Sequence, residues 1–558
     1  MRKFSLLTAA LMLGAAPAWA TVTDAGHYGA NHFGDYLSAQ VAAGDHDMAA
    51  AADLYRATLA TDPNNVDLLN RALFFTVGAG DMDEAVTLAR HTIKDNPGDR
   101  LSRTVLIIDA FRESNYADAR MQIAQSNRGA SGELLLYLLD AWASEGQGDT
   151  KQALADLKIV TDQGGGANVV ADYNRALILD LANQNADADA AYKQAVISSG
   201  HASRVVEAYG RFLERQGRAD DARAFYASMA GDPATSQVAA YGLARLQSGR
   251  KPDRLVSTPA EGAAEVVYGF ASLLTDAVNA DLAILYLRMG LALSPHHDAA
   301  KLLLADRLET VDKVDEAIKL YRSIDKGALE GANAQVLMAI DESRLDHNDQ
   351  AIADLKRYTS DNPVDVDGWM ALGDIQRSAE HFPEAVSAYD QAVKLHTPPT
   401  SKDWQLYFAR GVAQERAKNW TAAENDLQES LKLSPDQAQV LNYLGYSWVD
   451  QNRRLPEAIA MLEKARALSP FDGFVVDSVG WAYYRLGRYQ DAANTLLEAV
   501  KLEPGDPTVN EHLGDAFWKV GRKLDARFQW NHALAFGPAA DQKTQIEEKL
   551  KDGLGGRS

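Results

Sequence analysis

Histidines offer the widest chemistry among the side chains of this 558-residue sequence, because they can bind metals and transfer protons. Twelve are present, and only His296 and His297 are adjacent, with Asp298 beside them. No group of histidines and carboxylates has the spacing of metal ligands. Because the cluster follows Pro295, where a helix must end, we expect a solvent-exposed turn rather than a metal site.

Two further patterns resemble fragments of known catalytic or nucleotide-binding motifs. Ser323 and Lys326 have the spacing of the serine and lysine of some acyl-enzymes, a spacing that often arises by chance. The run 164–166 consists of three glycines but lacks the Gly-Lys-Ser/Thr ending of a phosphate loop. With no His-Glu-x-x-His or Gly-x-Ser-x-Gly motif either, the sequence predicts no catalytic residue, no metal site and no cofactor.

Side chains suited to contact a partner recur near the C-terminus. Rigid aromatic rings bury a large area at little entropic cost, and interaction hot spots favour Trp, Tyr and Arg. The candidate partner-binding residues are Asn442, Tyr446, Asp477, Trp481, Tyr484, Arg485, Trp518 and Lys519. Whether they act together depends on the elements that carry them.

A column of alanines repeats along most of the chain, usually every 34 residues. Self-similarity at such a period is typical of repeat architectures. The column consists of Ala51, Ala85, Ala119, Ala153, Ala188, Ala222, Ala283, Ala317, Ala351, Ala385, Ala423, Ala458, Ala492 and Ala526.

Three further sets of residues recur at fixed distances from the alanines. Twelve residues before the alanine lies a small residue, often glycine, such as Gly480; four residues after it lies a bulky one, such as Trp530; twelve after it a proline recurs, such as Pro504. Two helices approach closely only where facing side chains are small, the bulky residue fills the space beside the crossing, and proline ends the second helix. Each period therefore predicts a helix, a turn, a helix and a stop.

This pattern resembles the tetratricopeptide repeat family most closely between Leu441 and Pro538. One unit there carries Val476, Val479, Gly480, Tyr483, Ala492, Leu496, Ala499 and Pro504 in the order of the family pattern. The resemblance covers about 14 units, from roughly Asn31 to Pro538. It implies an all-α fold, a right-handed α-solenoid superhelix of tandem helix-turn-helix repeats, whose concave surface is lined by the first helix of each repeat.

The positions 3 before, 1 after and 4 after the small residue share one face of the first helix, because those offsets differ by four and three. On the C-terminal first helices this face includes Tyr446, Trp481, Tyr484 and Trp518, with Arg485 and Lys519 beside it. These rings either form a groove for a partner or stack between neighbouring first helices. Both readings stay open from the sequence.

The period is broken between Ala222 and Ala283, where loop-like stretches around Pro252 and Pro259 intervene. We therefore divide the chain into a signal peptide (1–20), an N-terminal array (21–248), an irregular break (249–262), a C-terminal array (263–538) and a capping helix with a tail (539–558).

The N-terminus has the layout of a cleavable secretory signal. Arg2 and Lys3 precede an apolar run, and Ala18-Trp19-Ala20 suits cleavage before Thr21. The chain contains no cysteine, so it cannot be a lipoprotein anchored through one, and no later stretch reaches the roughly 20 apolar residues of a transmembrane helix. The net charge of −21 disfavours nucleic acid as a partner. We expect a periplasmic protein.

The sequence thus predicts a non-enzymatic periplasmic scaffold or adaptor that binds other envelope proteins or peptide segments. The C-terminal units resemble bacterial periplasmic repeat proteins, some of which present cell-wall hydrolases to a protease while others serve export or assembly complexes. The alternatives are a peptidoglycan- or polysaccharide-binding protein whose rings stack on sugars, and then a hydrolase with unrecognised residues. Homo-oligomerisation stays open, because solenoid ends and edges associate without leaving a motif.

Overall fold

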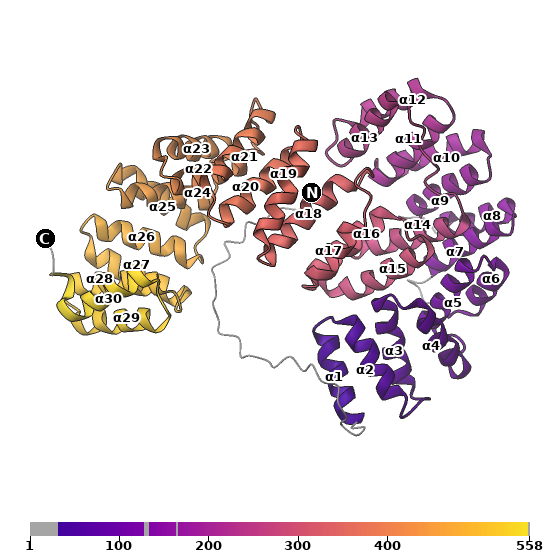
Figure 1. Cartoon of the computed structure of the whole chain (residues 1–558), viewed down its shortest axis with the longest axis horizontal. Coiled ribbons are helices and arrows are strands. Elements are labelled where there is room, and N and C mark those ends of the chain that lie inside the picture. The colour runs from indigo at the N-terminus through magenta and orange to yellow at the C-terminus, as the bar shows by residue number, and fades with distance from the viewer. Residues whose placement is uncertain (1–31, 128–132, 163–165, 556–558) are drawn as a thin grey trace. The chain divides into compact units, whose positions relative to one another are not determined.

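The computed structural model describes residues 32–127, 133–162 and 166–555, and these form thirty α-helices, two short 3-10 helices and no strand (Figure 1). The predicted all-α solenoid fold class is confirmed. The predicted signal peptide lies outside the described residues. Contacts divide the chain into unit 1, Met1–Asp341, and unit 2, Glu342–Ser558.

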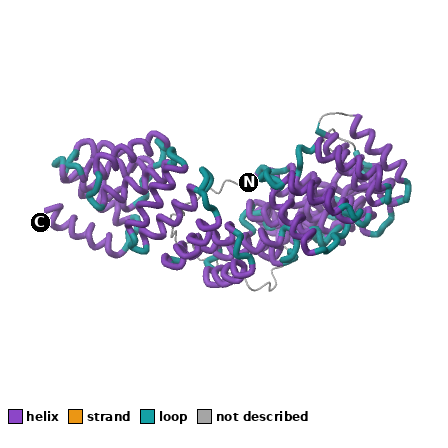
Figure 2. The backbone as a smooth tube through the Cα atoms, turned by 90° about the horizontal axis from the view of Figure 1, so that it is seen from above, coloured by secondary structure: helices purple, strands orange, loops and turns teal. Residues whose placement is uncertain are grey.

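Unit 1 begins with six helix pairs joined by short turns (Figure 2). Their first helices are α1 (His32–Gly44), α3 (Val66–Ala79), α5 (Arg100–Arg112), α7 (Glu133–Gly146), α9 (Ala167–Leu181) and α11 (Ser203–Arg215). Their second helices are α2 (Met48–Leu59), α4 (Met82–Asp95), α6 (Tyr116–Gln125), α8 (Thr150–Asp162), α10 (Asn185–Ser198) and α12 (Ala219–Met229).

The series changes after α12. Helix α13 (Ser236–Ser248) has no second helix after it, and a loop over 249–258 leads to α14 (Pro259–Leu273). The break is therefore shorter than predicted: Thr258 accepts a hydrogen bond from the Glu261 amide, and Pro259 suits the first helical turn, so helix begins inside the segment expected to be irregular. The division of the two arrays at this segment stays a prediction, and unit 1 continues to Asp341.

The rest of unit 1 contains further helices. They are η1 (Ala277–Asn279), α15 (Ala280–Leu293), α16 (Asp298–Thr310), α17 (Val314–Arg322) and the start of α18 (Gly331–Arg344). Helices α14 and α15 pack against each other and also return onto first helices of the earlier pairs, α14 onto α7 and α9 and α15 onto α3 and α5. This return across the array is absent from the repeat pattern.

Unit 2 keeps the regular alternation to its end. After α18 come α19 (Asn348–Asp361), α20 (Val366–Ser378), α21 (Phe382–Leu395), α22 (Trp404–Arg416), α23 (Trp420–Leu433), α24 (Ala438–Asp450), α25 (Leu455–Leu468), α26 (Gly473–Arg485), α27 (Tyr489–Leu502), α28 (Pro507–Lys519), α29 (Lys523–Ala535), α30 (Ala540–Asp552) and η2 (Gly553–Gly555). Helix α30 occupies the polar segment that the sequence predicts to cap the array. No helix of the described residues combines the length and apolar character of a membrane span.

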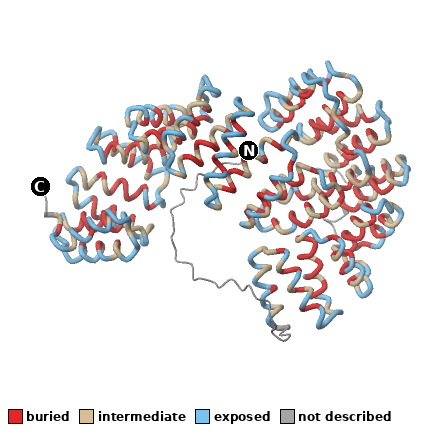
Figure 3. Tube along the Cα trace, in the orientation of Figure 1, coloured by how far each residue is buried: buried red, intermediate tan, exposed pale blue. Residues whose placement is uncertain are grey.

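The alanine column forms the centre of every pair. Its fourteen members lie on α2, α4, α6, α8, α10, α12, α15, α17, α19, α21, α23, α25, α27 and α29, and each is 0% exposed. Buried residues gather on the sides where helices pack together (Figure 3). The small residue at this position therefore sets the distance between the two helices of a pair.

The small and bulky columns meet at the same crossing. A Cβ added to Gly480 would lie 2.6 Å from Cγ of Leu496, and one added to Gly514 would lie 2.5 Å from the Trp530 ring. Gly210 and Gly373 face Tyr226 and Tyr389 in the same way. The bulky residue thus fills the space that the glycine leaves, as the sequence predicts.

Replacing Gly480 with alanine tests this crossing. The added methyl group must displace Leu496, so we expect a loss of roughly 1–3 kcal/mol in the free energy of unfolding, despite the better helix propensity of alanine. Urea unfolding followed by circular dichroism measures the change. The control is Gly505→Ala, whose new Cβ would lie 3.8 Å from Phe536 in ordinary contact; an equal loss in both variants would contradict the crossing.

Candidate partner-binding site

The predicted partner-binding residues lie on three neighbouring first helices of unit 2. Helix α26 packs against α24 on one side and α28 on the other. Asp477 is buried, Lys519 is exposed, and the others are partly buried. The offsets from the small residue therefore place these side chains on adjoining helices, with polar and aromatic groups only partly covered.

Trp481 is held between two other rings. The Tyr484 ring lies parallel to the indole at 4.7 Å between centroids, and the imidazole of His512 lies parallel to it at 4.0 Å. Two parallel rings this close to one indole have room only on opposite faces. Stacking between neighbouring first helices therefore occurs at Trp481, through the histidine of α28.

His512 also binds Asp477, which links α28 to α26 a second time. Its Nδ1 lies 2.9 Å and 3.0 Å from the two carboxylate oxygens, and both side chains are buried. Burial by itself lowers the pKa of His512, but the charge and the hydrogen bond of Asp477 outweigh burial, so the pKa is raised from 6.5. The contact therefore favours the protonated imidazole.

Trp518 lies where the chain's own C-terminal segment covers the array. Its ring packs on Trp530 at 5.3 Å between centroids, and a Cβ added to Gly553 would lie 2.0 Å from the indole. The ammonium group of Lys523 lies 3.7 Å from the indole centroid, a cation–π contact. The end of the predicted aromatic strip is thus closed by α29 and η2.

Two buried carboxylates on α28 hold α30 in place. Lys549 Nζ lies 2.6 Å from Glu511 and 2.7 Å from Asp515, and these two acids are 6% and 4% exposed. Burial raises the pKa of Asp515 even though Lys549 opposes that rise, and the same two carboxylates raise the pKa of Lys549 against its own burial. One ammonium group therefore pairs with two carboxylates on the face of the first helices that the three offsets define, which we call the inner face.

The other predicted residues stay more accessible. Burial, followed by the charge of Asp477, raises the pKa of Tyr446 to about 12. Arg485 donates a hydrogen bond to the Asp450 carbonyl at 3.2 Å, and its side chain is 29% exposed. Asn442 Oδ1 is buried without a hydrogen-bond partner. Tyr446 and Arg485, both partly exposed, thus form the accessible part of the predicted site.

The sequence fragments that resemble catalytic motifs do not form a reactive site. Ser323 Oγ donates to the backbone carbonyl of Leu320 at 2.7 Å, and Lys326 is exposed. Gly164 and Gly165 lie outside the described residues. Within the residues described, no three His, Cys, Asp or Glu side chains converge as metal ligands would.

The expectation of a solvent-exposed turn at His296-His297-Asp298 is wrong for His297. This residue is 7% exposed, accepts a hydrogen bond from the Ala300 amide on Nδ1, and contacts Glu265 through Nε2 at 3.0 Å. Proline locates the end of a helix correctly, but it carries no information about which distant segment packs on the turn. Here α14 does.

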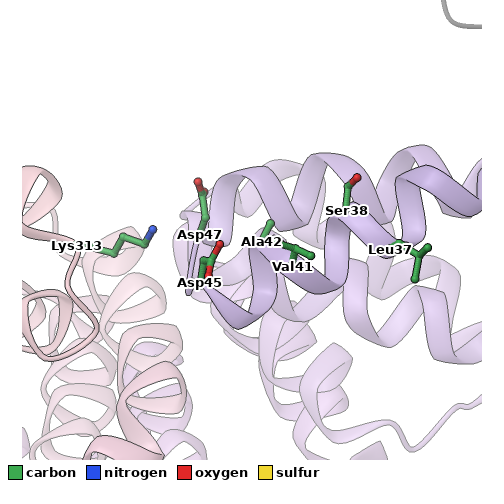
Figure 4. Close-up of a pocket in the computed structure, with 7 residues that line it drawn as sticks. All are labelled: Leu37, Ser38, Val41, Ala42, Asp45, Asp47 and Lys313. Atoms are coloured by element: carbon green, nitrogen blue, oxygen red, sulfur yellow. The ribbon is translucent and has the colours of Figure 1, made fainter. Parts of the chain in front are cut away.

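An open hollow lies at the first helix pair. It measures about 460 Å³ and is lined by Leu37, Ser38, Val41, Ala42, Asp45, Asp47 and Lys313. Figure 4 shows Lys313 across from the two aspartates. Ser38 is the one hydroxyl in this lining and has no histidine beside it, so the lining provides no activated nucleophile.

The sequence patterns did not predict two residues that contact the inner face of unit 2. His512 and Lys549 were not named, because neither stands at the offsets used to define the face. The same offsets on the first helices of unit 1 identify Trp142 and Tyr173, and both contact α14. The repeat offsets are therefore a signal in the sequence for these two residues.

His512→Asn tests the histidine–aspartate contact. The pKa values of His512 and Asp515 are both raised, so the folded chain holds these protons more tightly than the unfolded chain does. The stabilisation by His512 is complete below pH 6.5 and is lost as pH rises through the folded-state pKa. Urea unfolding from about pH 6 to about pH 9 should show a declining free energy in the wild type and a flatter profile in the variant, which also loses about 1.5–3 kcal/mol near pH 6. Parallel profiles would contradict the assignment.

Lys549→Met tests the neutralisation of the inner face. Removing the ammonium group leaves two carboxylates unpaired, so the free energy of unfolding should fall by about 3–5 kcal/mol. Adding Asp515→Asn should restore part of the loss, because the amide oxygen can still accept the Trp530 Nε1 hydrogen bond seen at 2.9 Å. Chemical denaturation measures both variants, and equal losses would show that charge is not the cause.

Comparisons with known proteins agree with the repeat geometry. The family model described as "Tetratricopeptide repeat" matches residues 173–237, 336–396, 376–438 and 408–473, and the model "TPR repeat" matches residues 480–521. These segments come from both units.

Two curated relatives are similar over part of their length. The chain is 29% identical over 203 residues to TPR repeat-containing protein PA4667 of Pseudomonas aeruginosa, covering 36% of this chain and 28% of that protein. It is 32% identical over 142 residues to cytochrome c-type biogenesis protein CycH of Rhizobium meliloti, covering 25% of this chain and 37% of that protein. The chain therefore spans less than two fifths of the length of either relative.

Among solved structures, the APC/C hetero-tetramer Cut9–Hcn1 is similar with a TM-score of 0.39 and 16% identity, over 94% of this chain and 96% of that chain. The matched segments include Gly210, Gly373 and Gly480, which the structure places at helix crossings. With its helix pairs, buried alanines and glycine crossings, this chain carries tetratricopeptide repeats in both units.

Proposed function

We propose that this protein is a scaffold of the bacterial cell envelope that binds protein segments along the inner face of unit 2. Tetratricopeptide arrays are protein-interaction scaffolds, and the observation that carries the proposal is the set of partly exposed aromatic and ionic side chains on α24 and α26. Tyr446, Arg485 and the edge of Trp481 would contact the partner. Such a mix of rings and arginine suits a hot spot.

The envelope setting is supported by the sequence of residues 1–20, which has the layout of a secretory signal. One relative is named for cytochrome c-type biogenesis, which supports a role in assembling other proteins. Two versions of the function follow: presentation of cell-wall enzymes to a protease, and support of an export or assembly complex.

The packing of Trp481 weighs against the glycan-binding alternative. A sugar stacks on the free face of a ring, whereas Tyr484 and His512 cover both faces of this indole. Trp518 is covered in turn by Trp530 and the C-terminal segment. Ring edges and polar groups remain for contact, and these suit a peptide better than a sugar face.

Site-specific photo-crosslinking in intact envelopes tests the proposal. A crosslinking amino acid at Tyr446 should capture a defined partner, identified by mass spectrometry, because this ring lies on the inner face. The matched control places the same group at Asn494, an exposed residue of the second helix α27, and should not capture that partner. Equal capture at both positions, or recovery of peptidoglycan fragments alone, would contradict a protein-binding inner face.

A further inference from the structure

The inner face of the N-terminal repeats is already filled, and the occupant is a segment of the same chain. Helices α14 and α15 pack on α7 and α9 and on α3 and α5 (Figure 1). The offsets that define the inner face in unit 2 place Trp142 and Tyr173 on the corresponding face here. The hairpin α14–α15, residues 259–293, therefore lies where a partner of this array would lie.

The middle of the hairpin contact is a close approach between a glycine and an indole. A Cβ added to Gly262 of α14 would lie 2.3 Å from the Trp142 ring, which is fully buried. The indole N–H donates to Asn174 Oδ1 at 2.8 Å, which fixes the ring's orientation. The face thus admits a helix only where that helix carries a very small residue.

A charged contact accompanies the close approach. Glu265, one helical turn after Gly262, pairs with Arg204, accepts a hydrogen bond from Tyr173 at 3.2 Å, and contacts His297 at 3.0 Å. Burial alone would raise the pKa of Glu265, but Arg204 and His297 outweigh burial and lower it. The ionised carboxylate is therefore the form that this face holds.

The second helix of the hairpin extends the contact to the first repeats. Arg288 Nε donates to the Gly78 carbonyl at 3.2 Å, and Leu285 lies 3.4 Å from a Cβ built at Gly78. Asp281 contacts His46 Nδ1 at 2.8 Å. The residues that contact the hairpin therefore range from the turn between α1 and α2 to α11.

We propose that the inner face of unit 1 is a helix-binding groove and that α14–α15 is its built-in, exchangeable ligand. The external ligand that fits is an amphipathic helix with glycine against Trp142 and a carboxylate three residues later against Arg204. The loop over 249–258 connects the hairpin to α13, and the contacts of its Arg254 with Asp180 and Asn183 must break for the hairpin to leave. While the hairpin is seated, this groove excludes partners.

Hydrogen exchange on the full-length chain, read by mass spectrometry, tests the proposal. In the wild type, residues 259–293 should exchange together and at least tenfold faster than α7, α9 and α11, because a ligand can leave while its groove stays folded. Glu265→Gln should speed exchange of residues 259–293 at least tenfold further. The matched control is Asp426→Asn, which alters a buried carboxylate paired with Arg410 in unit 2 and should leave residues 259–293 unchanged.

Binding in trans tests the groove itself. A labelled peptide of residues 258–294 should bind the Glu265→Gln chain at least tenfold more tightly than the wild type, and the same peptide carrying Gly262→Leu should not bind. Failure of the first peptide to bind the opened chain would overturn the proposal. If Glu265→Gln does not fold, the exchange rates of the wild type still test the proposal. Equal rates for residues 259–293 and for α7, α9 and α11 would show that the hairpin is part of one core with these helices and would overturn the proposal.

Discussion

The contact on which the whole architecture rests is the crossing where a small residue of one helix faces a small and a bulky residue of the next. At Gly480 the added methyl of an alanine would already strike Leu496, so the helices are as close as their backbones permit. Because the alanine of the column is fully buried in all fourteen pairs, these pairs share one local packing rule. Neighbouring pairs then stack, and stability accumulates from repeat to repeat rather than from one central core.

What differs between the units is how the inner face is completed. In unit 2 it is completed by rings stacked between first helices and by Lys549 of the capping helix, with Tyr446 and Arg485 left accessible. In unit 1 it is completed by the hairpin, whose Glu265 meets Arg204. In both cases a buried carboxylate is paired with a cation, since an unpaired charge there would cost several kcal/mol. The repeat fold is thus the same in both units. The side chains and helices that cover the inner face determine what each unit can bind.

The helices and their crossings could be predicted because their determinants lie within one period of the sequence. Gly514 and Trp530 are sixteen residues apart, so phase alone pairs them. The return of α14 could not be predicted in this way, because Glu265 lies 61 residues from Arg204 and obeys no period. His512 could not be predicted for a related reason: it stands outside the three offsets that define the face, yet it contacts Asp477 on the preceding first helix. Periodicity predicts which residues share a face, but it does not predict which segment covers that face.

The hydrogen bonds of the hairpin join segments that are synthesised far apart in time. Arg288 and Gly78 are 210 residues apart, so the first six pairs are synthesised long before the segment that covers them. Until α15 has emerged, a nascent chain presents Trp142, Arg204 and the apolar wall around them to its surroundings. During synthesis there is therefore an interval in which the N-terminal repeats expose an aggregation-prone surface. A chaperone would have to recognise this surface before the hairpin docks on it.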